Sequence, residues 1–327
     1  MAMIIKVFAL LLCICICNNA MQRAEASLSL SKDHYKQTCP NAENVIRETI
    51  RNATSFDPKI PARILRMHFH DCFIRGCDGS VLLDSTANNT AEKDAPPNVS
   101  LRAFYVIDDA KARLESLCPQ TVSCADILAI AARDVVVLAG GPNWDVLKGR
   151  KDGVISSASE TRNLPAPSFN VSQLLQSFIL RGLSLHDLVA LSGGHTLGFS
   201  HCSSFSSRLH KFNATHSMDP SMQPQFAQSL LSVCPNPTTN RSAGAFLDST
   251  STGFDNAYFK RLVEGKGVFG SDQALFTENK TKTMVKTFAK DENAFFRAFR
   301  RSMLKMGSVG VHTSDSQIRL NCRKVNS

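Results

Sequence analysis

The sequence lacks the features that mark several common classes of protein. Its Lys and Arg residues are dispersed and form no long basic run, and no nucleic-acid-binding motif accompanies them. A nucleic-acid partner is therefore not expected. The sequence also lacks an internal repeat and a low-complexity linker, so a repeat architecture is not expected either.

Long apolar runs are missing from all but the first residues. Lys6 is followed by an apolar stretch from Val7 to Cys17, and Ala24-Glu25-Ala26 has the small-x-small form of a cleavage site. This pattern predicts a secretory signal peptide over residues 1–26 and a mature domain over residues 27–327. The alternative is an uncleaved anchor, but the apolar stretch is shorter than the roughly 20 residues that span a bilayer. No membrane association is expected after cleavage.

The cysteine count agrees with secretion. Cys13, Cys15 and Cys17 lie within the predicted signal, which leaves an even number in the mature chain, namely Cys39, Cys72, Cys77, Cys118, Cys124, Cys202, Cys234 and Cys322. In an oxidising compartment these eight predict four disulfides, although the count does not choose the pairing. Seven Asn-x-Ser/Thr sequons point the same way, at Asn52, Asn88, Asn98, Asn170, Asn213, Asn240 and Asn279.

The chain is basic. Its 37 Lys and Arg against 28 Asp and Glu give a net charge of +9, with a pI near 9.1. We interpret this balance as a loose attraction to acidic polysaccharide or other acidic surfaces. A solvated basic surface without a specific partner is the alternative.

Helical periodicity recurs through the mature chain, and its 43% hydrophobic content is enough for one large domain or two lobes. Apolar residues recur at helical spacing between Ala103 and Leu117, between Val171 and Ile179, between Leu183 and Leu191, and twice between Met284 and Met303. Strand signals are few, with Trp144 to Leu147 the best candidate. The sequence therefore predicts an all-α fold with minimal β structure.

Two histidines stand in contrasting surroundings. Arg66 and His70 are four residues apart in a helical segment, about 6 Å along one face. A fixed cation beside a titratable imidazole could polarise and deprotonate a small substrate. His195 lies in Ser192-Gly193-Gly194-His195, at the end of an apolar-periodic segment, which is a suitable place for an axial metal ligand. Taken singly, each histidine could equally be an ordinary core residue.

Seven motifs in order resemble the secreted plant haem peroxidases, known as class III. They are RMHFHDCFIRGCDGSVLLD (66–84), EKDAPPN (92–98), VSCADIL (122–128), GGPNWDVLKGRKDG (140–153), LSGGHTLG (191–198), FDNAYF (254–259) and SDQALF (271–276). The resemblance extends from about Ser27 to the C-terminus. It implies a helical fold in which a distal and a proximal lobe enclose one haem b.

The resemblance also implies residue roles. His195 matches the proximal iron ligand, with Asp272 accepting its ring N–H. His70 matches the base that takes a proton from hydrogen peroxide, and Arg66 the cation that stabilises the developing charge. Asn98 matches the residue that holds the other nitrogen of His70 and is therefore expected to be unglycosylated.

Two further roles concern the substrates. Phe69 would wall the pocket. Pro165 in Leu164-Pro165-Ala166-Pro167 matches the contact for phenolic donors, although such a sequence is also an ordinary rigid loop. Donors would be oxidised in one-electron steps. Plausible donors are phenolics of lignin, suberin and the cell wall, and auxin, and a role in stress responses fits as well.

Two calcium sites follow from the resemblance. The first would use Asp71, Asp78 and Ser80 with the carbonyls of Ile74 and Gly76, an oxygen set suited to calcium. The second would use Thr196, Asp248 and Asp255, with Thr250 or Ser251 between them. Here the interval from Asp248 to Asp255 is one residue shorter than is usual in the family, which leaves the intermediate ligand open.

The disulfide partners are likewise implied by the resemblance, as Cys39–Cys118, Cys72–Cys77, Cys124–Cys322 and Cys202–Cys234. Asp126 and Arg150 are candidates for a buried ion pair beside these bonds, with exposed charges as the alternative.

The sequence also allows three other interpretations. One is an intracellular peroxidase of the same superfamily, which the signal and disulfides disfavour. Another is a calcium-binding or structural protein that has lost catalysis. A third is a zinc hydrolase built on His68 and His70, for which no HExxH-like spacing is found. Because the chain ends five residues after Cys322, we expect no C-terminal extension that directs some relatives to the vacuole. A secreted, monomeric enzyme of the extracellular space or cell wall is the expectation.

Overall fold

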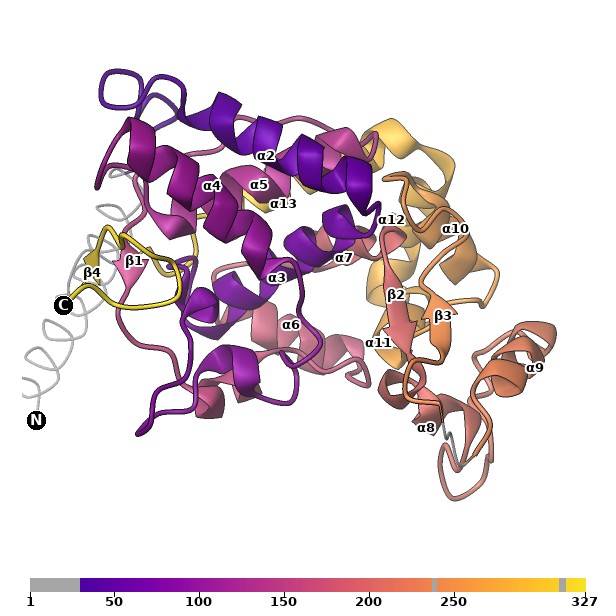
Figure 1. Cartoon of the computed structure of the whole chain (residues 1–327). Coiled ribbons are helices and arrows are strands. Elements are labelled where there is room, and N and C mark those ends of the chain that lie inside the picture. Colours follow the sequence, from indigo (N-terminus) through magenta and orange to yellow (C-terminus); the bar gives the residue numbers. More distant parts are fainter. Residues whose placement is uncertain (1–29, 237–239, 312–315) are drawn as a thin grey trace, which may run out of the picture.

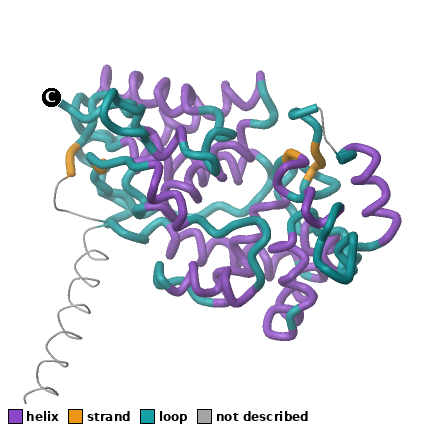
Figure 2. Tube along the Cα trace, turned by 90° about the horizontal axis from the view of Figure 1, so that it is seen from below, coloured by secondary structure: helices purple, strands orange, loops and turns teal. Residues whose placement is uncertain are grey.

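The computed structural model describes residues 30–236, 240–311 and 316–327 (Figure 1). The predicted signal peptide, residues 1–26, lies outside the described residues. Within those ranges no helix has the length and apolar character needed to cross a membrane. Helices dominate the fold, and the short strands form only two small antiparallel pairs (Figure 2). The all-α prediction is confirmed.

The first half of the mature chain packs around a central helix, α5. This helix is apolar on nearly all sides, and its residues from Cys124 to Val136 are buried, as expected for a helix enclosed by others. Ser123 caps its start by accepting a hydrogen bond from the Asp126 amide at 3.1 Å. Helices α2, α3 and α4 all pack against it. The bounds are α2 Ala42–Phe56, α3 Ile60–Ile74, α4 Phe104–Leu117 and α5 Cys124–Leu138.

The second half adds shorter helices. Helix α13 packs against α7, and α12 packs against α10, α11, α7 and α13. Helices α8 and α9 form a separate small core that includes the Cys202–Cys234 bond. The bounds are α6 Val171–Ile179, α7 Leu185–Ser192, α8 Ser206–Leu209, α9 Pro224–Val233, α10 Ala257–Val263, α11 Gly270–Thr277, α12 Asn279–Lys290 and α13 Glu292–Met306.

Short elements complete the described chain. Strand β1 (Asp152–Gly153) pairs with β4 (Ser316–Gln317), and β2 (Phe199–His201) pairs with β3 (Gly244–Phe246). The 3₁₀ turns are η1 Ser80–Leu82, η2 Glu92–Asp94, η3 Ala158–Asn163, η4 Gly193–Thr196 and η5 Cys202–Ser204.

The prediction of a strand from Trp144 to Leu147 is wrong. Trp144 and Val146 are buried and Asp145 is exposed, so the alternation that suggested a strand is real. Among the described residues no strand pairs with the segment, however, and the ladder contact next to it is an isolated bridge between Ser31 and Lys148. Alternation reports the burial of side chains, whereas a strand also needs a hydrogen-bonded partner.

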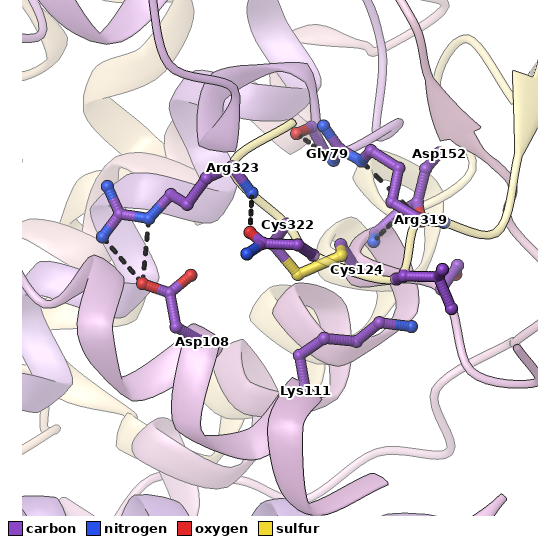
Figure 3. Close-up of a disulfide and its surroundings, with 12 residues drawn as sticks. Gly79, Asp108, Lys111, Cys124, Asp152, Arg319, Cys322 and Arg323 are labelled. Atoms are coloured by element: carbon purple, nitrogen blue, oxygen red, sulfur yellow. Dashed lines mark hydrogen bonds and ion pairs between the residues drawn. A yellow bond between two sulfur atoms is a disulfide. The ribbon is translucent and has the colours of Figure 1, made fainter. Parts of the chain in front are cut away.

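All four disulfide pairs are confirmed, as Cys39–Cys118, Cys72–Cys77, Cys124–Cys322 and Cys202–Cys234. The Cys124–Cys322 bond joins the start of α5 to the C-terminal segment (Figure 3). On one side of this bond Arg323 pairs with Asp108 at 2.7 Å. On the other, the buried Arg319 donates to the Gly79 carbonyl at 2.6 Å, and its amide donates to Asp152 at 2.8 Å. These contacts hold the C-terminal residues against α4 through Asp108, against β1 through Asp152, and against the segment that follows α3 through Gly79.

The predicted ion pair between Asp126 and Arg150 is confirmed and buried, with 2.7 Å between Oδ1 and Nη1. Asp126 also accepts a hydrogen bond from the Tyr35 hydroxyl at 2.6 Å. Arg150 donates from Nε to the Gly307 carbonyl at 2.9 Å. Because both charged groups find several partners, the cost of burying them is offset.

A cluster of phenylalanines fixes the end of α7, where the sequence reads Ser192-Gly193-Gly194-His195. Phe254, Phe295 and Phe299 contact one another. The Phe254 and Phe295 rings are nearly parallel at 5.6 Å between ring centres, and Phe299 meets both at steep angles. Gly193 lies against this cluster, because a Cβ atom there would overlap the Phe295 ring and lie 2.9 Å from Phe259. Its missing side chain therefore permits close packing.

We predict that Gly193→Ala destabilises the protein by about 1–3 kcal/mol, since overpacking forces well-ordered rings to move. The backbone of Gly193 is right-handed, so the effect would come from crowding alone. Thermal unfolding followed by circular dichroism measures it. Gly270→Ala is the matched control, because a Cβ at that helix start meets only ordinary contacts of 3.6 Å or more. Equal melting temperatures for the two variants would contradict the packing argument.

Candidate active site

The distal group is built on one face of α3. His70 is buried, and its Nδ1 lies 2.5 Å from Oδ1 of Asn98. The Asn98 amide nitrogen donates to the Glu92 carbonyl at 2.8 Å, and a carbonyl can only accept. The orientation of the amide is therefore fixed, with Oδ1 accepting from the Nδ1–H of His70.

Arg66 supports the same tautomer from the other side of the ring. Its Nε lies 3.2 Å from Nε2 of His70, so that nitrogen acts as an acceptor. Two more bonds hold the guanidinium, to the Ser100 hydroxyl and to the Pro97 carbonyl, both at 2.9 Å. His70 thus carries its proton on Nδ1 and presents a basic Nε2.

The protonation equilibria suit a base and a fixed cation. Burial, together with the positive charge of Arg66, lowers the pKa of His70 to about 3, and the bond to Asn98 opposes this shift only in part. Burial also lowers the pKa of Arg66 to about 10, with a further effect from Arg102. At neutral pH the imidazole is therefore neutral while Arg66 stays charged.

The Phe69 ring lies beside His70, with 5.8 Å between ring centres. It also packs against Phe73, with 4.3 Å between ring centres. It is half-buried, as expected for a wall of an open pocket. Pro165 lies in the loop between η3 and α6 and is also half-buried. That loop is tied to α11 by a 2.9 Å bond from the Ser271 amide to the Pro167 carbonyl.

The proximal group is centred on His195, which lies in η4 directly after α7. Its Nδ1 lies 2.8 Å from Oδ1 of Asp272 in α11. Asp272 is buried, and it also accepts from the Tyr258 hydroxyl at 2.9 Å and from the Phe269 amide at 3.2 Å. The side chain of His195 is 42% exposed although its partner is enclosed, so the rest of its ring faces open space.

Buried oxygen atoms gather beyond the end of α3. Asp71 accepts from the Gly79 amide at 3.0 Å, and Asp78 accepts from the Ser80 amide at 3.0 Å. Burial raises the pKa of Asp71 well above its usual range, and the charge of Asp78 adds to the shift. Of the two carbonyls assigned to this site, that of Ile74 accepts from Asn163 at 3.4 Å and that of Gly76 from the Asp78 amide at 2.8 Å.

Several of these oxygen atoms have no hydrogen-bond donor. The Ser80 hydroxyl and both carboxylate oxygens of Glu92 are buried without a hydrogen bond. Burial, with the charge of Asp71, raises the pKa of Glu92 to about 9. Buried oxygens without hydrogen-bond donors beside buried acids fit a site for a hard cation.

A second oxygen cluster lies beside η4. The Thr196 hydroxyl donates to Asp248 at 2.6 Å and lies 3.2 Å from Asp255. The Thr250 hydroxyl reaches the same two carboxylates, at 3.3 and 3.1 Å. Ser251 instead uses its carbonyl, which accepts from the Gly198 amide at 2.9 Å. Burial and the nearby Asp255 raise the pKa of Asp248.

The disulfide between Cys72 and Cys77 excludes the zinc site that the sequence also allowed. His68 lies 3.7 Å from the sulfur of Cys72, and with Cys77 the three could have formed a metal cluster. Cys72 and Cys77 are bonded to each other, however, and a disulfide offers no thiolate. His68 and His70, two residues apart on a helix, also point to different sides.

Three residues of the site were missed by the sequence analysis. Glu92 and Tyr258 lie within the quoted motifs EKDAPPN and FDNAYF, so a signal for them existed. Ser100 gave no signal, because its contact with Arg66 spans 34 residues of sequence.

Comparison with known proteins agrees with this geometry. The model of the peroxidase family matches residues 43–291. Peroxidase 66 of Arabidopsis thaliana is 64% identical over 300 residues, covering 91% of this chain and 92% of that protein. Peroxidase 64 of Arabidopsis thaliana is 57% identical, covering 91% and 93%, and Peroxidase 5 of Vitis vinifera is 47% identical, covering 93% of each chain. The chain belongs to the peroxidase family, among the plant class III haem peroxidases that use hydrogen peroxide to oxidise their substrates.

Proposed function

We propose that this protein is an extracellular peroxidase that oxidises phenolic donors, with one haem b that His195 would bind, with His70 as the base, and with two bound calcium ions. The main observation behind the proposal is that hydrogen bonds to both ring nitrogens fix His70 in the tautomer with its proton on Nδ1. Asn98 accepts from one ring nitrogen while Arg66 donates to the other, which leaves a single basic site beside a permanent cation. Such a pair suits the deprotonation and cleavage of a small, weakly acidic substrate.

The residues fit a haem. His195 is oriented by a buried carboxylate and is partly exposed, so it would be able to bind a haem iron, and the bond to Asp272 makes its ring more basic. When bound, the haem iron supplies the redox chemistry of the reaction. Asp272 is itself held by Tyr258, whose pKa is raised by burial and by the carboxylate, so that the hydroxyl remains a donor.

The chain's own residues handle the proton and the charge. His70 Nε2 would take a proton from hydrogen peroxide and return it to the departing oxygen, and the Arg66 guanidinium would stabilise the negative charge that develops. Arg66 must first release Nε2, which it contacts at 3.2 Å. Its bonds to Ser100 and Pro97 keep it within reach during that movement. Phe69 would border the peroxide pocket and Pro165 the entrance for phenols.

The calcium sites would use the two oxygen clusters. Asp71, Asp78, Ser80 and the carbonyls of Ile74 and Gly76 would form the first. Thr196, Asp248, Asp255 and Thr250 would form the second. Thr250 is favoured over Ser251 because its hydroxyl lies near both carboxylates.

Secretion is supported by four disulfides and by the exposure of six sequons. The seventh, Asn98, is buried and uses both side-chain polar atoms, which supports its lack of a glycan. We propose a monomer of the extracellular space or cell wall. Its positive charge favours acidic polysaccharide as a partner.

The function is tested on purified secreted protein. We expect a strong Soret band and oxidation of guaiacol that requires hydrogen peroxide. His70→Leu should retain the Soret band yet react with peroxide slower by orders of magnitude, because the base is lost while His195 remains. His195→Ala should instead weaken haem retention. A protein without haem, or a His70→Leu variant with wild-type kinetics, would overturn the assignment.

The pKa of His70 gives a pH prediction. The base is neutral above its pKa and protonated below it, so the rate constant for the reaction with peroxide should fall only as the pH drops through about 3. Arg66→Leu removes a neighbouring positive charge and should move this acid limb to higher pH. Stopped-flow measurements after a pH jump would record both profiles. An unshifted limb in the variant would contradict the proposed coupling.

Removal of calcium should lower stability, because Asp71 and Asp78 would lose the cation that offsets the cost of burying their carboxylates. A site filled at 100 times its dissociation constant stabilises by about 2.7 kcal/mol. We expect EGTA to lower the melting temperature and added calcium to restore it.

Single variants separate the two calcium sites by metal analysis. Asp78→Asn should reduce the calcium content of the first site, and Thr250→Val that of the second. Ser251→Ala is the control for Thr250 and should retain full content. Loss of calcium in Ser251→Ala alone would reverse the choice of ligand.

A further inference from the structure

Most of the excess positive charge of the mature chain lies in one part of the fold. Residues 27–256 contain 21 basic and 21 acidic residues, whereas residues 257–306 contain 11 basic and 5 acidic ones. This second segment forms α10 to α13, and α12 packs against the other three helices. The charge that looked dispersed along the sequence is therefore gathered on neighbouring helices.

Most of this charge lies on the solvent side of α12 and α13. Val285 and Phe288 face inward from α12, as do Phe295, Phe299 and Met303 from α13. On each helix basic residues recur every four positions, about 6 Å apart along the axis. We call the set the α12–α13 basic face; it comprises Lys282, Lys286, Lys290, Arg297, Arg300, Arg301 and Lys305, of which all but the half-buried Lys282 are exposed.

Few acidic residues offset this face. Arg297 lies 3.7 Å from Asp291, and Lys305 lies 3.0 Å from Asp187. Among the described residues, Lys286, Arg300 and Arg301 have no ion-pair partner within 4.0 Å. Like charges four residues apart on a helix repel each other, so the free face is electrostatically unfavourable.

Some cations elsewhere in the molecule are paired with nearby carboxylates. Arg63 lies 2.6 Å from Asp57, and Arg113 lies 3.0 Å from Glu48. On α12 and α13, in contrast, the basic residues outnumber the acidic ones and lie close together on neighbouring helices, so their charges reinforce one another. A repeating anion would relieve the repulsion along both rows at once.

The composition of the face indicates which anion. No large hydrophobic side chain is exposed within α11, α12 or α13, so the surface lacks the apolar anchors of a membrane-binding helix. We propose that the α12–α13 basic face binds an acidic polysaccharide whose carboxylates repeat along the polymer. This proposal rests on the extracellular location proposed above.

Binding at this face leaves the distal residues untouched. Helix α12 packs against α11, which carries Asp272, whereas Arg66 and His70 lie on α3, which packs against α5. The polymer would hold the enzyme by its proximal helices. Oxidation of a small donor should therefore proceed with the same turnover in the bound and free enzyme.

The test compares two holoenzyme variants with equal net charge. Lys286→Gln/Arg300→Gln/Arg301→Gln removes three charges from the face, and Lys32→Gln/Arg51→Gln/Lys151→Gln removes three exposed charges from the neutral part of the chain. Binding to immobilised polygalacturonate is measured without peroxide. We expect the first variant to bind about tenfold more weakly than wild type, and the second to bind within about twofold of it. Wild-type binding should weaken with added salt.

Equal losses in the two variants would overturn the proposal, since attraction would then depend on net charge alone. Equal or tighter binding of the wild type to anionic phospholipid vesicles or to single-stranded DNA would also contradict it. Guaiacol turnover is measured on the same preparations and should be unchanged in both variants. Absence of turnover in all three proteins would contradict the proposed function and leave the binding comparison intact.

Discussion

The hydrogen bond between His70 and Asn98 is the constraint on which the distal site depends. It decides which ring nitrogen carries the proton, and it can do so only because the Asn98 amide is itself oriented by the Glu92 carbonyl. Glu92 in turn lies beside the buried carboxylate of Asp71, the residue that follows His70 in α3. The base, its orienting amide and the buried acids are therefore coupled, and a change in one is transmitted to the others through short, enclosed contacts.

The proximal side follows the same logic with different partners. His195 is half exposed, but Asp272 is enclosed and held by Tyr258 and the Phe269 amide. An enclosed carboxylate with two fixed donors cannot turn away from the imidazole, so the ring has one preferred orientation. The phenylalanine cluster behind Gly193 holds the backbone of this segment. Rigid packing thus supports a group that must keep one side open.

In the second half of the chain the buried and the exposed helix faces have different roles, which the sequence did not indicate. Its inner helix faces support His195 through Asp272 and the aromatic cluster, while the outer faces of α12 and α13 carry most of the excess charge. A helix can meet two demands at once because its buried and exposed residues alternate with the helical period. The proposed attachment to an acidic polymer would use mainly exposed positions of these helices.

The sequence by itself determined the helical class and the family, and it supplied the candidates for the main site residues. Apolar periodicity located the helices because burial acts on one face of each, and the motifs preserved His70, Arg66 and His195 in order. It failed at Trp144 to Leu147, where alternation occurred without a partner strand. Only the tertiary structure brought Ser100 to Arg66, Tyr258 to Asp272, Thr250 to both proximal carboxylates and Arg319 to Gly79. Such contacts join residues that local patterns treat separately, so they exist only once the chain has packed.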